Sequence, residues 1–161
     1  MFEGLKKALR RGLLLDSSLL FLYLFGCYDF SSIPRLRDPK DYTENDFLLL
    51  HSLVKETMTL YCLPNVLTEF GNYATKLHGY KRKEFLDHVK NDLTDMIEHY
   101  IPMAEIVGWD KFSQFGVTDS AIAMFARTHE CLVVVKDGKL YGMLSNMGIQ
   151  AIDFKVFRSL S

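Results

Sequence analysis

The sequence predicts an α/β protein, a three-layer α/β/α sandwich built on a central, mostly parallel sheet. Two observations lead to this fold class. Short apolar runs, typical of fully buried strands, alternate with stretches of helical periodicity. Acidic residues recur where such a run gives way to a helix, as at the strand ends of a parallel sheet. The 161 residues have the size of one domain, so we treat 1–161 as a single unit.

Composition excludes several classes of protein. Hydrophobic residues make up 48% of the chain and charged residues 24%, which indicates a globular rather than a disordered protein. The formal net charge of −1 excludes a broadly cationic surface, so binding to nucleic acid requires a local basic cluster. Cys27, Cys62 and Cys131 are odd in number and widely spaced beside apolar residues. We therefore expect buried free thiols and a reducing, cytoplasmic location.

The first predicted elements are a basic segment, a strand and a helix. Residues 1–11 carry four basic side chains ahead of an apolar run, which superficially matches a signal peptide. Asp16 opposes that interpretation, because an aspartate within an inserted segment costs about 2.5–3.5 kcal/mol and no small-residue cleavage motif follows. We expect no membrane association. Residues 12–15 instead predict a buried strand that ends at Asp16, and residues 19–25 predict a helix that ends near Gly26.

The middle of the chain continues the alternation. Residues 27–42 have little periodicity and contain two prolines, which predicts a long connecting loop and a candidate flap over a site. Thr43 is the expected N-cap of a helix with an apolar stripe. A short strand over 60–63 leads into a helix that starts at Pro64, and residues 81–100 predict one long amphipathic helix.

The last third supplies two more strands. Residues 101–116 predict a connector with a helical segment, and Thr118 is the expected N-cap of the following helix. Residues 131–135 form a strongly β-prone run. Asp137 then opens a short helix, and residues 149–154 predict the final strand.

Four acidic residues are the candidate site: Asp16, Glu69, Asp119 and Asp137. Two of them follow strands, one lies at a helix start on the same sheet edge, and Glu69 is long enough to reach back across that edge. Ligands of open parallel sheets bind beyond the carboxyl ends of the strands, where the strand order reverses. Clustered carboxylates raise one another's pKa unless a cation compensates. Because the five histidines show no metal-ligand spacing, all-oxygen ligation favours Mg²⁺ or Mn²⁺ over zinc, and these ions serve phosphodiester hydrolysis.

Each acid also has a simpler structural explanation. Asp16 is a turn residue before a helix, Asp119 a helix-start residue, and Asp137 part of an Asp-Gly turn. Glu69 borders an apolar face from which it reaches solvent. An acid that interrupts a leucine-rich run is costly unless compensated, so the functional interpretation is strongest for Asp16.

Four segments together resemble a PIN-domain nuclease: LLLDSSLL at 13–20, PNVLTEFGN at 64–72, GVTDSAI at 116–122 and LVVVKD at 132–137. The resemblance extends from about residue 12 to residue 157 and depends on the order and spacing of these segments. It implies a parallel sheet flanked by helices and a one-metal or two-metal site that cuts single-stranded RNA. The four acids match the acidic positions of the family. Ser18 and Thr118 are expected to orient the carboxylates or a phosphate.

The chain departs from the family pattern at two positions. Many members carry Thr and then an acid just before the last matched aspartate, whereas this chain has Val135 and Lys136. Lys136 is therefore expected either to pair with Asp137 or to meet a phosphate.

Basic residues are the expected contacts to the RNA backbone: Arg35, Arg37, Lys76, Lys81, Arg82 and Lys83. Such clusters are also common on merely solvated faces. The resemblance to PIN nucleases, many of which belong to toxin–antitoxin pairs, further implies an antitoxin-type protein inhibitor and a homodimer as partners.

Three functions are consistent with the sequence. The leading hypothesis is a Mg²⁺- or Mn²⁺-dependent endoribonuclease acting on single-stranded RNA as the toxin of a toxin–antitoxin pair. The alternative is a catalytically degenerate PIN-like module that binds nucleic acid or protein without turnover. A receiver-type phosphoacceptor domain, with Lys136 as its strand-end lysine, is the weakest fit because no adjacent acidic pair follows the first strand.

Overall fold

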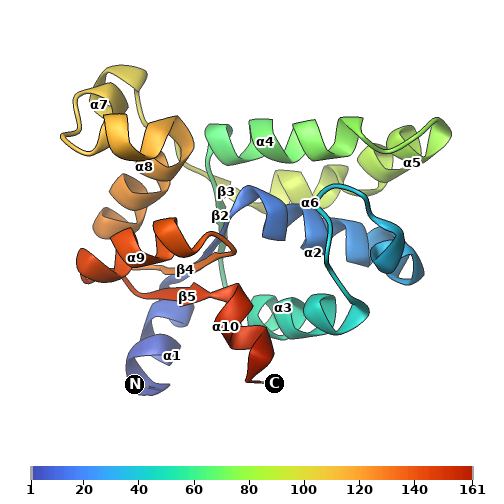
Figure 1. The fold of residues 1–161 in the computed structure, drawn as a ribbon, viewed down its shortest axis with the longest axis horizontal. Coiled ribbons are helices and arrows are strands. Elements are labelled where there is room, and N and C mark those ends of the chain that lie inside the picture. Colours follow the sequence, from blue (N-terminus) through green and yellow to red (C-terminus); the bar gives the residue numbers. More distant parts are fainter. Residues whose placement is uncertain (1, 161) are drawn as a thin grey trace.

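Five parallel strands form one central sheet with helices around it in the computed structural model, which describes residues 2–160 (Figure 1). The strands are β1 (Leu13–Leu15), β2 (Leu60–Cys62), β3 (Ile97–Glu98), β4 (Leu132–Val135) and β5 (Ala151–Asp153). Their order across the sheet is β3-β2-β1-β4-β5. The predicted α/β class with a flanked parallel sheet is confirmed. Residues 1 and 161 of the predicted unit lie outside the described part.

The chain changes direction across the sheet between β1 and β4. From β1 it adds β2 and β3 on one side, and β4 and β5 on the other. Leu15 is in register with Val134, and the N–H of Asp16 donates to the Val134 carbonyl at 3.0 Å. The carboxyl ends of these two buried strands therefore lie side by side at the point of reversal, where open parallel sheets bind ligands.

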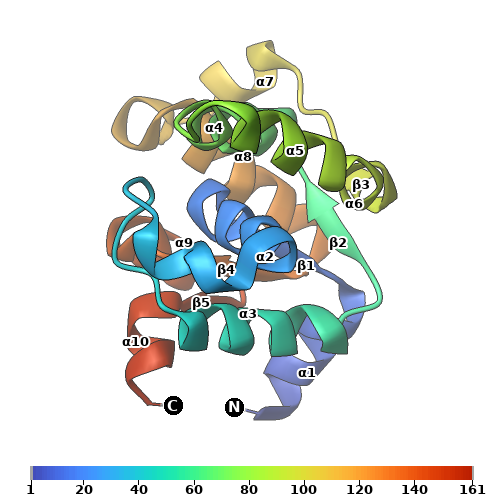
Figure 2. The same ribbon diagram turned by 90° about the vertical axis from the view of Figure 1, so that its right-hand side faces the viewer.

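The helices are α1 (Phe2–Arg11), α2 (Ser17–Asp29), the 3₁₀ helix η1 (Phe30–Arg35), α3 (Glu44–Glu56), α4 (Pro64–Thr75), α5 (Tyr80–His88), α6 (Lys90–Asp95), α7 (Met103–Val107), α8 (Phe112–His129), α9 (Gly138–Asn146) and α10 (Phe154–Ser159). Helix α2 lies between α3 and α4 in both views (Figures 1 and 2). Most of its residues are apolar and buried, so it forms the centre of the helical layer beside the sheet.

Two predicted helix starts are confirmed. Thr43 and Asp46 form a reciprocal capping box at the start of α3. Pro64 lies in the first turn of α4, where its missing N–H costs nothing.

The predicted loop over 27–42 is mostly wrong. Helix α2 passes Gly26, ends at Asp29 and continues into η1, so only residues 36–43 are irregular. Gly26 does not terminate the helix. A Cβ at this position would overlap the ring of Phe47 on α3, so the glycine permits close packing of α2 against α3.

The predicted long helix over 81–100 is also wrong. It breaks at the buried Val89, whose φ and ψ are −85° and 0°, and so divides into α5 and α6. Residues 97–98 then pair with β2 as the edge strand β3. The last predicted strand, 149–154, is shorter than expected because Asp153 caps the unpredicted helix α10.

Thr118 is not the N-cap predicted for its helix. Helix α8 already includes residues 112–115, and a kink follows at Gly116, where φ is 78° and ψ is −172°. Glycine suits this conformation because it has no Cβ. The hydroxyl of Thr118, inside the helix, is used by a tertiary contact described below.

The cysteine prediction is confirmed for two of three residues. Cys62 and Cys131 are buried free thiols, whereas Cys27 is exposed near the end of α2. Between residues 2 and 160 no helix combines the length and the apolar character needed to cross a bilayer.

Candidate functional site

The four predicted acids line one cavity of about 340 Å³ at the carboxyl edge of the sheet. The lining residues are Asp16, Ser17, Ser18, Glu69, Tyr73, Thr118, Asp119, Ile122, Lys136, Asp137, Leu140 and Lys155. They come from four separate segments that follow or flank β1, β2 and β4, and from α10. The topology of the sheet therefore brings together acids that are far apart in the sequence.

Asp16 connects the ends of the two central strands. Its Oδ2 accepts a 2.5 Å hydrogen bond from the N–H of Lys136, just after β4. Its Oδ1 accepts from the N–H of Leu19 at 2.9 Å, which makes Asp16 the N-cap of α2, and from Ser18 Oγ at 3.1 Å. Burial raises the pKa of Asp16, and these hydrogen bonds oppose that rise. The aspartate is thus both a cap and a wall of the cavity.

Glu69 is held by hydroxyl groups on both of its oxygens. Ser17 Oγ donates to Oε2 at 2.6 Å, and Thr118 Oγ1 donates to Oε1 at 2.6 Å. The contact to Thr118 agrees with its expected role beside the acids. The contact from Ser17, which is buried, was not expected from the sequence. Glu69 is partly exposed, and its carboxylate is directed across the sheet edge by these two contacts.

Asp119 is the acid most affected by its neighbours. Its pKa is raised to about 6, mainly by burial and also by the negative charges of Asp137, Glu69 and Asp16, against a smaller opposite effect of Lys139. Within residues 2–160, no group donates a hydrogen bond to its carboxylate. Asp119 therefore lies close to other carboxylates, and no described group uses its oxygens as hydrogen-bond acceptors.

Asp137 has a clear structural role. It is exposed, and its Oδ1 accepts from the N–H groups of Lys139 and Leu140 at 2.7 and 3.0 Å, which caps α9. It nevertheless lines the cavity, and its charge contributes to the raised pKa of Asp119.

The chemistry of the donors suits a hard divalent cation, because four carboxylates and several hydroxyls line the cavity without imidazole or thiolate. Besides burial, the charges of the neighbouring carboxylates raise the pKa of Asp119, and a cation would relieve this repulsion. The geometry is less complete. Among the described residues, no three His, Cys, Asp or Glu side chains converge closely enough to hold a metal ion as they stand. The donor set fits the ion, but ligation requires movement of side chains such as Glu69.

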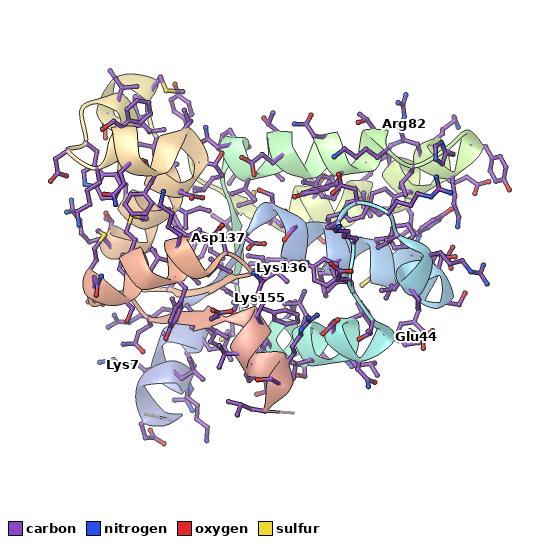
Figure 3. All side chains as sticks on the ribbon, in the orientation of Figure 1. Lys7, Glu44, Arg82, Lys136, Asp137 and Lys155 are labelled. Atoms are coloured by element: carbon purple, nitrogen blue, oxygen red, sulfur yellow. The ribbon has the colours of Figure 1, made fainter. Side chains whose placement is uncertain are left out.

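Lysine side chains form the cationic part of the cavity wall. The Nζ of Lys136 lies 4.0 Å from the centre of the Tyr42 ring and donates to the Lys40 carbonyl at 3.1 Å. Burial lowers the pKa of Lys136. The predicted ion pair between Lys136 and Asp137 is absent from the described structure. In Figure 3, Lys136, Asp137 and Lys155 lie near one another where β4 ends and α10 begins.

The predicted RNA contacts lie apart from the acids. A hollow of about 210 Å³ is lined by Arg35, Arg37, Lys76 and Lys81, among others. Three lysines of the predicted set form ion pairs with acids, namely Lys76 with Asp38, Lys81 with Asp29 and Lys83 with Asp87. Arg82 lies on α5, well away from Asp137 (Figure 3). The structure thus gathers part of the cluster and neutralises much of its charge.

These observations define an α/β protein with an acidic cavity at the reversal point of a parallel sheet. No family model, curated protein or solved structure matches the chain.

Proposed function

We propose that this protein is a metal-dependent endoribonuclease of the PIN-domain type, which hydrolyses phosphodiester bonds in single-stranded RNA. The observation that carries the proposal is the meeting of Asp16, Glu69, Asp119 and Asp137 in one cavity at the reversal point of the sheet. Acids that only cap helices would not need to lie together in one cavity. Burial, and after it the negative charges of the other three acids, raise the pKa of Asp119, which supports a site that a bound cation would neutralise.

The four acids are the proposed holders of Mg²⁺ or Mn²⁺. Such an ion would neutralise charge on the scissile phosphate and lower the pKa of a water molecule. Asp16 is held in place by backbone and hydroxyl donors, and Glu69 is oriented by Ser17 and Thr118. Asp119, whose oxygens accept no hydrogen bond within residues 2–160, must lose its proton before it can act as a ligand.

The test is cleavage of a mixed-sequence single-stranded RNA by the purified protein in Mn²⁺, Mg²⁺ or EDTA. Asp119→Asn is prepared in parallel with Glu44→Gln, an isosteric change of an exposed acid far from the cavity (Figure 3). We expect metal-dependent cleavage by the native protein and by Glu44→Gln, and none by Asp119→Asn. Equal cleavage by all three would identify a contaminating nuclease and reject the proposal.

A second candidate function is a catalytically degenerate PIN-like module that binds RNA or a protein. It is favoured by two observations: the described acids do not converge into a ready ligand group, and Lys136 stands where many PIN nucleases have an acid. RNA binding by the correctly folded native protein, measured beside the cleavage assay and without metal-dependent cleavage, would select this function. Four statements about this protein stay predictions: the toxin role, the antitoxin-type inhibitor, the homodimer and the cytoplasmic location.

A further inference from the structure

We infer that Lys136 is a substrate-positioning residue whose ammonium group binds a backbone phosphate of the polynucleotide beside the acids. This inference rests on the proposed function, since it names the group by which the same site holds its substrate. It concerns a residue at which the chain departs from the family pattern, and it follows from the contacts of that residue.

The backbone of Lys136 is fixed relative to the acids. It is the first residue after β4, and its N–H donates to Asp16 Oδ2 at 2.5 Å. Lys136 lines the same cavity as the four acids. A phosphate bound by the ammonium would therefore lie at the acidic site and not on a distant surface.

The ammonium of Lys136 is positioned in advance. It lies over the Tyr42 ring and donates to the Lys40 carbonyl. Tyr42 is itself buried, with its hydroxyl 3.0 Å from Ser18 Oγ, and Ser18 donates to Asp16. The contacts thus form a closed ring that begins and ends at Asp16. A lysine restrained in this way loses less side-chain entropy on binding than a mobile one, and its ammonium has three N–H groups, of which the Lys40 carbonyl accepts one.

The charge of the cavity favours a cationic side chain beside the substrate. Four carboxylates line it, and they repel a phosphodiester anion. Two lysines, Lys136 and Lys155, are among the lining residues, and Lys155 is exposed on α10. Lys139 is anchored in a similar way, to the Gln114 carbonyl and the Phe115 ring, but it does not line the cavity. Lys136 therefore combines a fixed ammonium with a position at the acids.

The test uses binding, measured by fluorescence anisotropy with a labelled single-stranded oligoribonucleotide in EDTA, where metal-dependent cleavage does not occur. Lys136→Met removes the charge and keeps all but the last atom of the unbranched side chain. Lys136→Arg keeps the charge. Lys139→Met is the matched control, because it removes one equal charge near the site from a lysine with similar anchors. Circular dichroism checks folding, and Lys136→Gln replaces the methionine variant if that variant is misfolded.

We expect Lys136→Met to weaken binding about tenfold and to make the slope of log K against log salt shallower by about 0.7, the change for one phosphate contact on a single strand. Lys136→Arg and Lys139→Met should retain the native slope. Where the native protein cleaves RNA, Lys136→Met should raise KM and leave kcat nearly unchanged.

The outcomes separate this inference from the nuclease proposal. If Lys136→Met alone binds RNA more weakly and has a shallower slope of log K against log salt, the phosphate contact is supported even if the native protein cleaves nothing. Equal binding and slope in Lys136→Met and the native protein reject the contact even if cleavage is intact. Equal weakening by Lys136→Met and Lys139→Met indicates long-range charge instead of a contact and also rejects it, as does a native protein that binds no oligonucleotide.

Discussion

The hydroxyl of Ser17 donates a 2.6 Å hydrogen bond to Oε2 of Glu69, across 52 positions of the chain. This contact joins the first turn of α2 to the middle of α4, and Thr118 on α8 completes it from the other side. Two short bonds to both oxygens fix the plane of the carboxylate. The orientation of Glu69 is therefore determined by three helices and not by its own rotamer preference.

Loss of either hydroxyl should reduce activity without unfolding the protein. Ser17→Ala and Thr118→Val each remove one donor to Glu69, and groups that orient a metal ligand typically contribute about 10–100-fold to metal affinity or activity. We expect a loss of at least tenfold in Mn²⁺-dependent RNA cleavage at subsaturating metal. Thr128→Val, also on α8 but bonded only to the Met124 carbonyl, is the control and should retain native activity. A loss in Thr128→Val equal to that in Thr118→Val would point to general damage to α8 instead of a loss of the Glu69 contact.

Removal of the Asp119 charge should stabilise the metal-free protein at neutral pH. The folded-state pKa of about 6 exceeds the ordinary value of 3.8, so the folded protein becomes less stable as the pH rises from about 4 to about 6. The full shift would correspond to about 3 kcal/mol, but the side chain is only partly buried, and solvent screening reduces this to about 1 kcal/mol. Asp119→Asn should therefore melt about 3 °C higher than the native protein at pH 7.5 in EDTA.

The same comparison at pH 3 supplies the control, because this pH lies below the ordinary pKa of 3.8, so Asp119 is largely protonated in both folded and unfolded chains. Differential scanning calorimetry should show no gain for Asp119→Asn there. A gain of equal size at both pH values would mean that packing, and not charge, causes the effect.

Binding of Mn²⁺ should depend on the same proton. A metal ligand must be ionised, so affinity should be constant above about pH 7 and fall about tenfold per pH unit well below the pKa of Asp119, which is about 6. Isothermal titration at pH 5.0, 6.0 and 7.5 measures this directly. At a hundred times Kd the ion should add about 2.7 kcal/mol to stability, and EDTA should remove it. An affinity that does not change between pH 5.0 and 7.5 would exclude Asp119 from the ligand set.

The strands that build the site could be predicted from the sequence, because burial on both faces leaves an unmistakable pattern. Leu13–Leu15 and Leu132–Val135 are fully buried and entirely apolar. Their ends determine where Asp16 and Asp137 lie. Strand β3 has no such signal. It comprises two exposed residues whose extended conformation depends on pairing with β2, so the helical periodicity of the surrounding residues was misleading.

The acids of the site could be predicted, together with Ser18 and Thr118, which bond to Asp16 and Glu69, but the contacts of Ser17 and Tyr42 could not. Strand ends and helix starts are local features, and they identified Asp16, Asp119 and Asp137. The hydroxyl of Ser17 and the ring of Tyr42 act on residues 52 and 94 positions later in the chain, through contacts that depend on how α2, α4 and β4 pack together. A serine beside a candidate acid was the single local signal for Ser17, and Tyr42 had none.

Helix α2 continues past its predicted end at Gly26, and the substitution Gly26→Ala tests the role of this glycine inside the helix. In an exposed helix, Gly→Ala is stabilising by about 1 kcal/mol because alanine has the higher helix propensity. Here the added methyl group would overlap the Phe47 ring, which is buried and packed against Tyr23, Phe30 and His51, so the ring has little room to move. Overpacking costs about 1–3 kcal/mol, which exceeds the gain from propensity.

Urea denaturation should therefore show Gly26→Ala to be less stable than the native protein by about 1–2 kcal/mol. The double variant Gly26→Ala/Phe47→Leu provides the control, since a smaller side chain at Phe47 makes room for the methyl group. Its loss of stability should be smaller than the sum of the two single losses, as expected for residues in contact. A stabilising effect of Gly26→Ala alone would show that α2 and α3 do not approach closely at Gly26, and that the glycine serves the chain in some other way.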